Sequence, residues 1–279
     1  MALPAEERQR LQDIACELRL TMVDVMAWSG GAHIGGSLSI VEVLSILYFK
    51  YLNIDPKRPD WEDRDRFILS KGHAAAGYIP VLAKRGYFLE ETLKTFNHFG
   101  SPFAMHPDCN KVVGCDASAG SLGHGLSMAV GLGLGARKLK KAYKTICLMG
   151  DGECCEGSVW EAAMSASHFK LGNVIGIVDR NRLMIDGMTE DVMALEPFAD
   201  KWRAFGWEVI EVNGHEFDEL DAALEKAWAA TDVPVLILAH TVKGKGVDFM
   251  ENNVLYHYAS GDSALCDRAK ASILSREEG

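Results

Sequence analysis

Apolar residues recur at helical spacing near the start of the chain. One stripe contains Leu11, Ile14, Ala15, Leu18, Met22, Val25 and Met26. This spacing predicts an amphipathic helix over residues 6–28. A glycine-rich run at residues 29–39 should end this helix, and Ser39 is expected to cap a second one.

Five short apolar runs predict buried strands, at residues 67–69, 145–149, 173–178, 207–212 and 235–239. One predicted helix begins at the capping-box pattern Ser158-x-x-Glu161 and ends at Leu171-Gly172; another covers residues 216–230. Strands that alternate with helices predict an α/β fold, a doubly wound and mostly parallel sheet with helices on both faces. Ligands bind at the carboxyl edge of such sheets.

Two glycine-rich or irregular stretches add to this picture. Gly131, Gly133 and Gly135 resemble a dinucleotide fingerprint, but they lie inside a predicted helix rather than after a strand, so close helix packing explains them better. Residues 99–118 show little periodicity and contain His106. Long irregular segments of compact domains are usually functional loops.

Composition and charge exclude several classes of protein. The chain has 279 residues, of which 48% are hydrophobic, and a formal charge of −10, which would repel a nucleic-acid backbone. No apolar run is long enough to span a membrane, and the N-terminus does not resemble a signal peptide. The seven cysteines show no CxxC spacing, so we expect reduced thiols and a cytoplasmic protein.

Two polar side chains follow successive predicted strands. Asp151 lies between two glycines after the strand at 145–149, and Asn181 follows the next strand, 30 positions later. A βαβ unit of this length brings both strand ends to one edge of a parallel sheet. Mg²⁺ takes about six oxygen ligands, and Asp151, Asn181 and the carbonyl of Leu183 could supply the protein's share. This pattern predicts a metal-diphosphate site.

The segment "GDGECCEGSVWEAAMSASHFKLGNVIGIVDRNRLMIDG" resembles the thiamine-diphosphate motif of transketolases. Further segments with counterparts in that family, in the same order, are "AHIGGSLS", "DRDRFILSKGHAAAGYIPVL", "HPDCNKVVGCDASAGSLGHGLS" and "TVKGKGVDFMENNVLYH". The chain is most similar to the N-terminal subunit of split, two-chain transketolases. The resemblance implies one diphosphate-binding domain over residues 1–279, in which residues 241–279 form an active-site loop and a C-terminal segment.

The resemblance also implies site residues. The metal, Mg²⁺ or Ca²⁺, would be bound by Asp151, Asn181 and the Leu183 carbonyl. Thiamine diphosphate would be contacted by His73, Gly120, Leu122, Gly152, Asn181, Lys243 and His257. Glu156 matches an acid at the subunit contact and is counted with the cofactor set.

Four histidines, His33, His73, His106 and His257, are implied to act in catalysis. In ketol transfer the donor carbonyl becomes an alkoxide that positioned donors must stabilise. A base must then take a proton from the neighbouring hydroxyl, and imidazole titrates near the required pH. The resemblance gives His33 and His257 this role and assigns His106 to the hydroxyls of the sugar.

In this family a second, pyrimidine-binding domain supplies the glutamate that activates the cofactor. We therefore expect a partner subunit that carries this domain, an α₂β₂-like assembly and no activity of the chain alone. The ketose stays open, because Met105, Tyr256 and Tyr258 depart from the usual pattern. Two alternatives remain: the α subunit of a thiamine-dependent 2-oxoacid dehydrogenase, and a non-catalytic cofactor-binding homologue.

Overall fold

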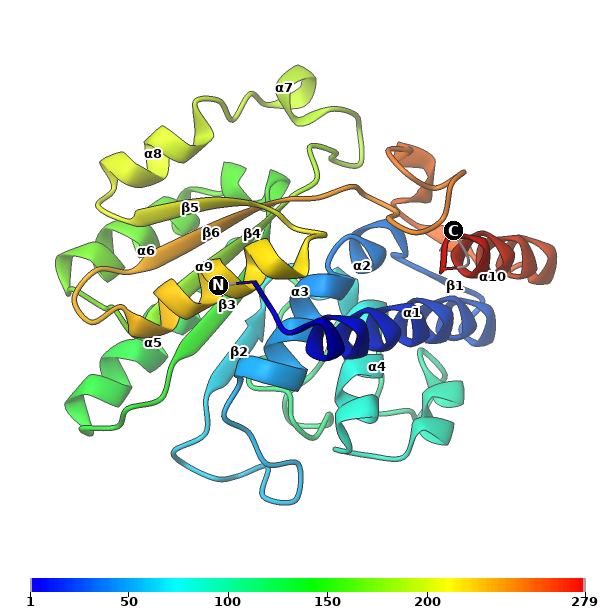
Figure 1. Ribbon diagram of the computed structural model, residues 1–279, viewed down its shortest axis with the longest axis horizontal. Coiled ribbons are helices and arrows are strands. Elements are labelled where there is room, and N and C mark those ends of the chain that lie inside the picture. Colours follow the sequence, from blue (N-terminus) through cyan, green and yellow to red (C-terminus); the bar gives the residue numbers. More distant parts are fainter. Residues whose placement is uncertain (1, 278–279) are drawn as a thin grey trace.

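The computed structural model describes residues 2–277 of the chain (Figure 1). Its helices are α1 (Ala5–Trp28), α2 (Gly35–Leu38), α3 (Val41–Ile46), α4 (Ala75–Arg85), α5 (Gly125–Lys138), α6 (Gly157–His168), α7 (Thr189–Val192), α8 (Phe198–Ala204), α9 (Phe217–Ala229) and α10 (Ser263–Glu277). Its strands are β1 (Gly31–Ala32), β2 (Arg66–Leu69), β3 (Thr145–Gly150), β4 (Val174–Arg180), β5 (Glu208–Asn213), β6 (Val235–His240) and β7 (Ala259–Ser260). The long first helix and all five predicted strands are confirmed, with boundaries that differ by at most two residues.

The central sheet is parallel, with strand order β2-β3-β4-β6-β5. Strands β3 and β4 are neighbours, and Gly150 pairs with Asp179 at their carboxyl ends. The prediction that one βαβ unit brings the ends of these two strands together is therefore confirmed. Asp151 and Asn181 follow directly on those ends, so both lie at the same edge of the sheet.

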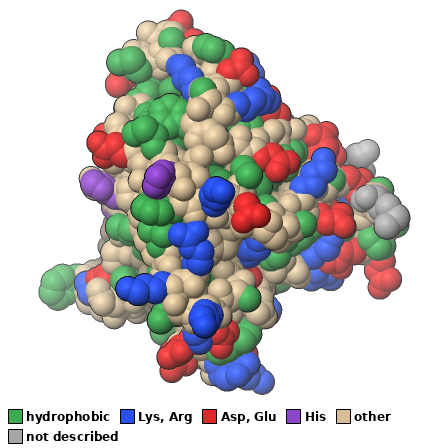
Figure 2. Space-filling model, turned by 90° about the vertical axis from the view of Figure 1, so that its left-hand side faces the viewer, with side chains coloured by type: hydrophobic (Ala, Val, Ile, Leu, Met, Phe, Trp, Pro, Cys, Tyr) green, Lys and Arg blue, Asp and Glu red, His purple; other side chains and the backbone are tan. Residues whose placement is uncertain are grey.

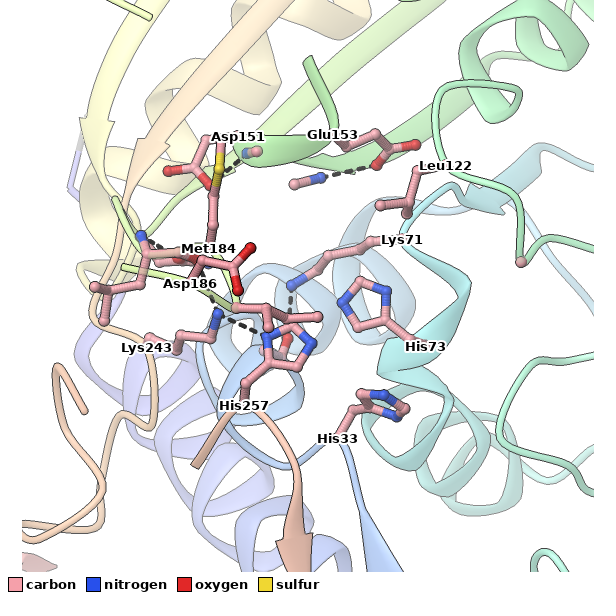
Figure 3. A pocket seen from close by; sticks show the side chains of 17 residues that line it. His33, Lys71, His73, Leu122, Asp151, Glu153, Met184, Asp186, Lys243 and His257 are labelled. Atoms are coloured by element: carbon pink, nitrogen blue, oxygen red, sulfur yellow. Dashed lines mark hydrogen bonds between the residues drawn. The ribbon is translucent and has the colours of Figure 1, made fainter. Parts of the chain in front are cut away.

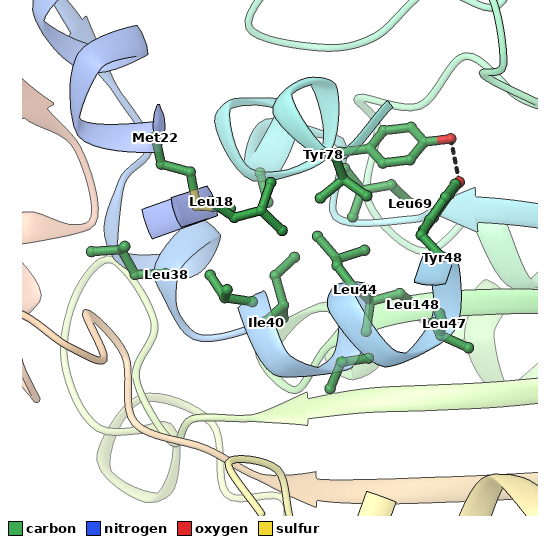
Figure 4. Close-up of a cluster of buried hydrophobic side chains, with 14 of the residues drawn as sticks. Leu18, Met22, Leu38, Ile40, Leu44, Leu47, Tyr48, Leu69, Tyr78 and Leu148 are labelled. Carbon is green, nitrogen blue, oxygen red and sulfur yellow. Dashed lines mark hydrogen bonds between the residues drawn. The ribbon is translucent and has the colours of Figure 1, made fainter. Parts of the chain in front are cut away.

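Helices cover both faces of the sheet, because the strand side chains alternate between two apolar cores. On one face, Ile146 and Leu148 pack with buried residues of α1, α3, α4 and α9 (Figure 4). On the other face, Cys147 and Met149 pack with α5, α6 and α8. Alternate residues of a strand point to opposite faces, so burial on both faces explains the continuous apolar runs. The predicted doubly wound α/β fold is confirmed.

The predicted helix starts are wrong at two places. Ser39 ends α2 and does not cap α3, whose N-cap is Ile40; the Ser39 hydroxyl donates to Asp179 Oδ2 at 2.7 Å. Helix α6 begins after Glu156, and the Ser158 hydroxyl donates to the carbonyl of Gly123 at 3.0 Å, so no capping box forms. In both cases a partner distant in sequence takes the hydroxyl.

The glycines of α5 differ in their surroundings. A Cβ at Gly133 would lie 2.5 Å from Val174 Cγ2, so this glycine allows α5 to approach β4 closely. The expected close packing is confirmed there. Gly131 and Gly135 would meet nothing within 4 Å, so close packing does not explain them.

A two-stranded antiparallel ladder joins distant parts of the chain. Strand β1 pairs with β7, with Gly31 opposite Ser260 and Ala32 opposite Ala259. Helix α10 packs along α1 beside this ladder (Figure 1). His33 follows β1 and His257 precedes β7, so this ladder holds the two histidine segments next to each other.

Acidic and basic side chains are interspersed on the face that Figure 2 shows. No disulfide joins the cysteines of residues 2–277, which agrees with the expected thiols. Within the same residues, no helix combines the length and the apolar character that crossing a bilayer requires.

Candidate active site

A cavity of about 360 Å³ opens at the carboxyl edge of the sheet (Figure 3). Its lining comes from the segments after β1, β2, β3, β4 and β6. The lining residues are His33, Gly36, Lys71, His73, Gly120, Leu122, Gly150, Asp151, Gly152, Glu153, Asn181, Leu183, Met184, Ile185, Asp186, Lys243 and His257. All the predicted metal ligands and most of the predicted cofactor contacts are in this set.

Asp151 is 2% exposed and lies on one wall of this cavity. Its Oδ1 accepts the N–H of Gly152 at 2.8 Å, while Oδ2 accepts the N–H of Arg182 at 2.6 Å and Nη1 of Arg180 at 3.1 Å. Burial raises the pKa of Asp151, and the nearby carboxylate of Asp179 adds to this effect. The hydrogen bonds and Arg180 oppose the rise, so the carboxylate is held by fixed donors.

Asn181 is oriented by its buried neighbour Asp179. Its Nδ2 donates to Asp179 Oδ2 at 2.8 Å, and its Oδ1 accepts the N–H of Leu183 at 3.0 Å. Burial alone would raise the pKa of Asp179, but the Lys71 ammonium, 2.5 Å from Oδ2, holds it below its ordinary value. Arg182 has a positive φ of 64°, which turns the chain so that its N–H faces Asp151.

Lys243 connects the turn after β4, at residues 181–183, to the histidines. Its Nζ donates to the carbonyl of Leu183 at 2.8 Å and lies 3.0 Å from Nδ1 of His257. Burial and the charge of Lys71 lower the pKa of Lys243 to about 8. The carbonyl of Leu183, a predicted metal ligand, thus already accepts a hydrogen bond from a positively charged group.

The four predicted catalytic histidines come from separate segments and converge. The ring of His33 lies 5.3 Å from that of His73, 5.5 Å from that of His257 and 6.3 Å from that of His106. His73 and His257 stack at 5.3 Å. His106 is exposed and lies outside the cavity lining, beside Gly120.

Burial keeps three of these imidazoles uncharged at neutral pH. It lowers the pKa of His73 to about 2, with help from the charge of Lys71, and the pKa of His257 to about 3, with help from Lys243. Burial also lowers the pKa of His33. The Nδ1 atom of His33 is buried and makes no hydrogen bond to any described residue. A neutral imidazole presents one donor and one acceptor.

The cavity fits a diphosphate and a hard cation. Four glycines, Gly36, Gly120, Gly150 and Gly152, line it, and a Cβ at Gly36 would meet only Lys71 Nζ at 3.6 Å and His73 Nε2 at 3.9 Å. Backbone is thus open to a ligand there, with two lysines nearby. The side chains of Asp151 and Asn181 and the Leu183 carbonyl offer oxygens, which Mg²⁺ and Ca²⁺ prefer. Oδ1 of Asp151, Oδ1 of Asn181 and the Leu183 carbonyl each accept one hydrogen bond and can take a further partner. Within residues 2–277, no three His, Cys, Asp or Glu side chains form a metal cluster by themselves.

Glu156 lies apart from the other predicted contacts. It is exposed and outside the cavity lining. It packs close to Gly123, where an added Cβ would lie 2.6 Å from that of Glu156, and Gly123 has a φ of 81°. Its position fits the predicted subunit contact better than a contact to the cofactor.

Two buried charged residues of the cavity were not predicted. Glu153 is 3% exposed and accepts the Ser70 hydroxyl and the N–H groups of Gly123, at 2.8 Å, and Gly150, at 3.0 Å. Lys71 is 2% exposed and donates to the carbonyl of Gly36 at 2.6 Å as well as to Asp179. Both residues follow the carboxyl end of a strand, Glu153 after β3 and Lys71 after β2, and this position in the sequence could have identified them as candidate site residues.

Comparisons with known proteins were consistent with one another. Residues 11–272 match the family model "Transketolase, thiamine diphosphate binding domain". A 6-deoxy-6-sulfo-D-fructose transketolase subunit of Clostridium sp. is 43% identical, covering 91% of this chain and 92% of that protein. One of the subunits of the apulose-4-phosphate transketolase of Phocaeicola vulgatus is 40% identical, covering 93% and 92%.

A solved structure gives the same fold. The transketolase of Campylobacter jejuni superposes with a TM-score of 0.90 at 34% identity. The match covers 95% of this chain but 43% of that one. The chain therefore spans less than half of that transketolase, and nearly the whole length of the two subunits.

Proposed function

Because the chain belongs to the transketolase family, we propose that it is the cofactor-binding subunit of an enzyme that transfers a two-carbon ketol unit from a ketose to an aldose. One observation carries this proposal: the rings of His33, His73, His106 and His257 converge, and all of these except His106 line the same cavity as Asp151 and Asn181. Thiamine diphosphate, when bound, supplies the nucleophilic carbon and the electron sink of the reaction.

In this proposal the edge of the sheet anchors the diphosphate. Asp151, Asn181 and the carbonyl of Leu183 hold Mg²⁺ or Ca²⁺, and Gly152 lets the backbone approach the phosphates. Lys243 adds a positive charge beside the carbonyl of Leu183. Gly120 and Leu122 lie farther along the same cavity, where the rings of the cofactor would extend.

The histidines then serve the reacting end of the sugar. His257 accepts a hydrogen bond from Lys243 at Nδ1, so its Nε2 carries the proton and can donate to an oxygen of the donor. The unpartnered Nδ1 of His33 can accept from or donate to a hydroxyl. His106, exposed beside Gly120, would bind the hydroxyls of the donor sugar.

A partner subunit is part of the same proposal. The two relatives that match over 92% of their length are named as subunits, whereas the single-chain transketolase is more than twice as long as the match. We propose a partner that carries the pyrimidine-binding domain, in an α₂β₂-like assembly. The absence of disulfides among the described residues supports a location in the cytoplasm.

The donor is a ketose phosphate or a related sugar. The two relatives are named for 6-deoxy-6-sulfo-D-fructose and for apulose-4-phosphate, one with a sulfonate and the other with a phosphate. Ketol transfer from either sugar would need the same carbonyl end. The histidine cluster would contact the shared end. We therefore propose that residues of the partner select the far end.

Ketol transfer should be assayed with the chain alone, with the co-expressed partner, and with both in the presence of chelator. We expect turnover only with the partner, thiamine diphosphate and a divalent cation. Full turnover by the isolated chain would refute the split site. Cofactor binding without turnover on any ketose would favour the non-catalytic homologue, and turnover of a 2-oxoacid would favour the dehydrogenase α subunit.

A further inference from the structure

A network of buried polar side chains lies outside the candidate site and connects α1, α3 and the turn between β5 and α9. Arg19 donates to Oε1 of Glu42 from Nη2, and Oε2 of Glu42 lies 3.0 Å from Nδ1 of His215. The three side chains are 8%, 7% and 9% exposed. Separating the two partners of a buried ion pair would leave an uncompensated charge and is energetically costly. We therefore expect these three side chains to keep fixed positions.

The two ends of this network, His215 and Arg19, both bind the backbone of residues 242–245. Nε2 of His215 accepts the N–H of Val242 at 2.8 Å, and Nε of Arg19 donates to the carbonyl of Lys245 at 3.3 Å. These two backbone groups lie on either side of Lys243. Gly246, with a φ of 94°, would place a Cβ 2.8 Å from the Arg19 side chain, so the segment also packs directly on Arg19.

The hydrogen bonds of His215 define its tautomer. Nε2 must be unprotonated to accept from Val242, so the proton is on Nδ1, where Glu42 accepts it. A carboxylate behind an imidazole fixes both the ring orientation and the tautomer, as it does for histidines that serve metal sites. By accepting the proton of Nδ1, Glu42 therefore keeps Nε2 of His215 unprotonated and able to accept from Val242.

We propose that His215, oriented by Glu42 and Arg19, is a positioning residue for Lys243. It fixes the backbone of residues 242–245 so that the Lys243 ammonium reaches both the carbonyl of Leu183 and the imidazole of His257. Its effect on cofactor affinity rests on the proposed function, whereas its effect on the segment does not. His215 itself lies outside the lining of the candidate site.

Two substitutions separate the two hydrogen bonds of His215. In His215→Asn the amide replaces Nδ1 and keeps the bond to Glu42, but nothing reaches Val242. In His215→Gln the longer side chain can place its carbonyl oxygen near Nε2 and accept from Val242. His240→Asn is the matched control, because His240 bonds the exposed Glu211 at 3.2 Å on the neighbouring strand.

Hydrogen–deuterium exchange of the full chain tests the segment without any ligand. We expect faster exchange of the Val242 amide in His215→Asn, near wild-type exchange in His215→Gln, and no change in His240→Asn. In titrations with thiamine diphosphate and Mg²⁺, His215→Asn should bind the cofactor about tenfold more weakly than the wild-type protein, whereas His215→Gln and His240→Asn should bind it normally. Thermal unfolding midpoints identify any variant that has lost its fold.

A double-mutant cycle with Lys243→Met tests whether His215 acts through Lys243. Non-additive losses of cofactor affinity would support the proposal, because His215→Asn has nothing left to position once the ammonium is gone. Additive losses, or unchanged exchange at Val242 in His215→Asn, would overturn it. If wild-type chain binds no cofactor, the exchange result still decides the structural claim, and the proposed function fails separately.

Discussion

Lys243 and His257 form a lysine–imidazole pair, with Nζ and Nδ1 3.0 Å apart. The ammonium donates, so the lone pair of Nδ1 is occupied and Nε2 carries the proton. The same ammonium donates to the carbonyl of Leu183 in the turn after β4. One lysine therefore links the predicted metal ligands to the predicted catalytic histidines.

Replacing this lysine should alter both halves of the site. Lys243→Met keeps the aliphatic stem but removes the charge and the donor, so cofactor affinity should fall by about tenfold or more. The pKa of His257 should rise, because the Lys243 charge adds to burial in lowering it. Proton NMR titration of the histidine ring measures this shift. Lys245→Met, in the same segment, is the control, and an unchanged His257 titration would contradict the pairing.

Asp151 is the strongest candidate metal ligand. Asp151→Asn removes one negative charge from the oxygen set, and we expect Mg²⁺-dependent binding of thiamine diphosphate to weaken by about 100-fold. Calorimetry with and without Mg²⁺ measures this loss. Arg180 would lose a buried partner, so unfolding must be measured as well. Asp191→Asn, on exposed α7, should bind normally; equal binding by both variants would remove Asp151 from the metal site.

A methyl group at Gly36 should block the cavity without harming the fold. The added Cβ meets only side-chain ends at 3.6 and 3.9 Å, and Gly36 lies in helix α2, where alanine is favoured over glycine. We expect Gly36→Ala to match or exceed wild-type thermal stability and to bind the cofactor more weakly. Gly131→Ala, on the open side of α5, should gain about 0.5–1 kcal/mol and bind normally. Unchanged binding by Gly36→Ala would place the ligand elsewhere.

His33 should matter for turnover more than for cofactor binding. Its ring lies beside the rings of the other three predicted catalytic histidines. In the complex with the partner, His33→Asn should lower kcat by about 10²–10⁴-fold with little change in cofactor affinity. Steady-state kinetics and calorimetry together separate the two effects. His98→Asn, which alters an exposed histidine bonded to the carbonyl of Trp28, serves as the comparison.

The buried histidines should make unfolding depend on pH. His73 has a pKa of about 2 when folded and about 6.5 when unfolded, so below pH 6.5 the unfolded chain binds the extra proton. Stability is then fully present above pH 6.5 and falls as the pH decreases, by at most about 1.4 kcal/mol per pH unit from His73. Urea unfolding between pH 5 and 7 measures the slope. His73→Gln should reduce this slope but not abolish it, because the lowered pKa values of His257 and His33 still contribute, whereas His168→Gln, on the surface, should leave it unchanged.

Elements with strong periodicity could be predicted from sequence, as could the meeting of Asp151 and Asn181. Buried strands and a βαβ unit impose local patterns, and the end of each strand then fixes where the next residue lies. Helix starts were harder to predict from the sequence. The Ser39 side chain, for example, bonds Asp179, 140 positions away, and does not cap α3. Local capping rules contain no information about such partners.

The same reason explains the missed residues. Lys71 reaches Asp179 across 108 positions, and His215 reaches Glu42 across 173. Neither residue lies in a pattern that identifies its partner, and both matter through contacts that only the folded chain creates. The family resemblance supplied the histidine roles, while the distances among those histidines came from the structure.

The β1–β7 ladder has a consequence for redesign of the donor site. Gly31 pairs with Ser260 and Ala32 with Ala259, so the backbones that carry His33 and His257 share one hydrogen-bonded frame. A segment exchange with a relative that replaced one strand and kept the other would change the spacing between the two imidazoles, whatever the side chains. Turnover by such an exchange should therefore survive only when both strands are transplanted as a matched pair.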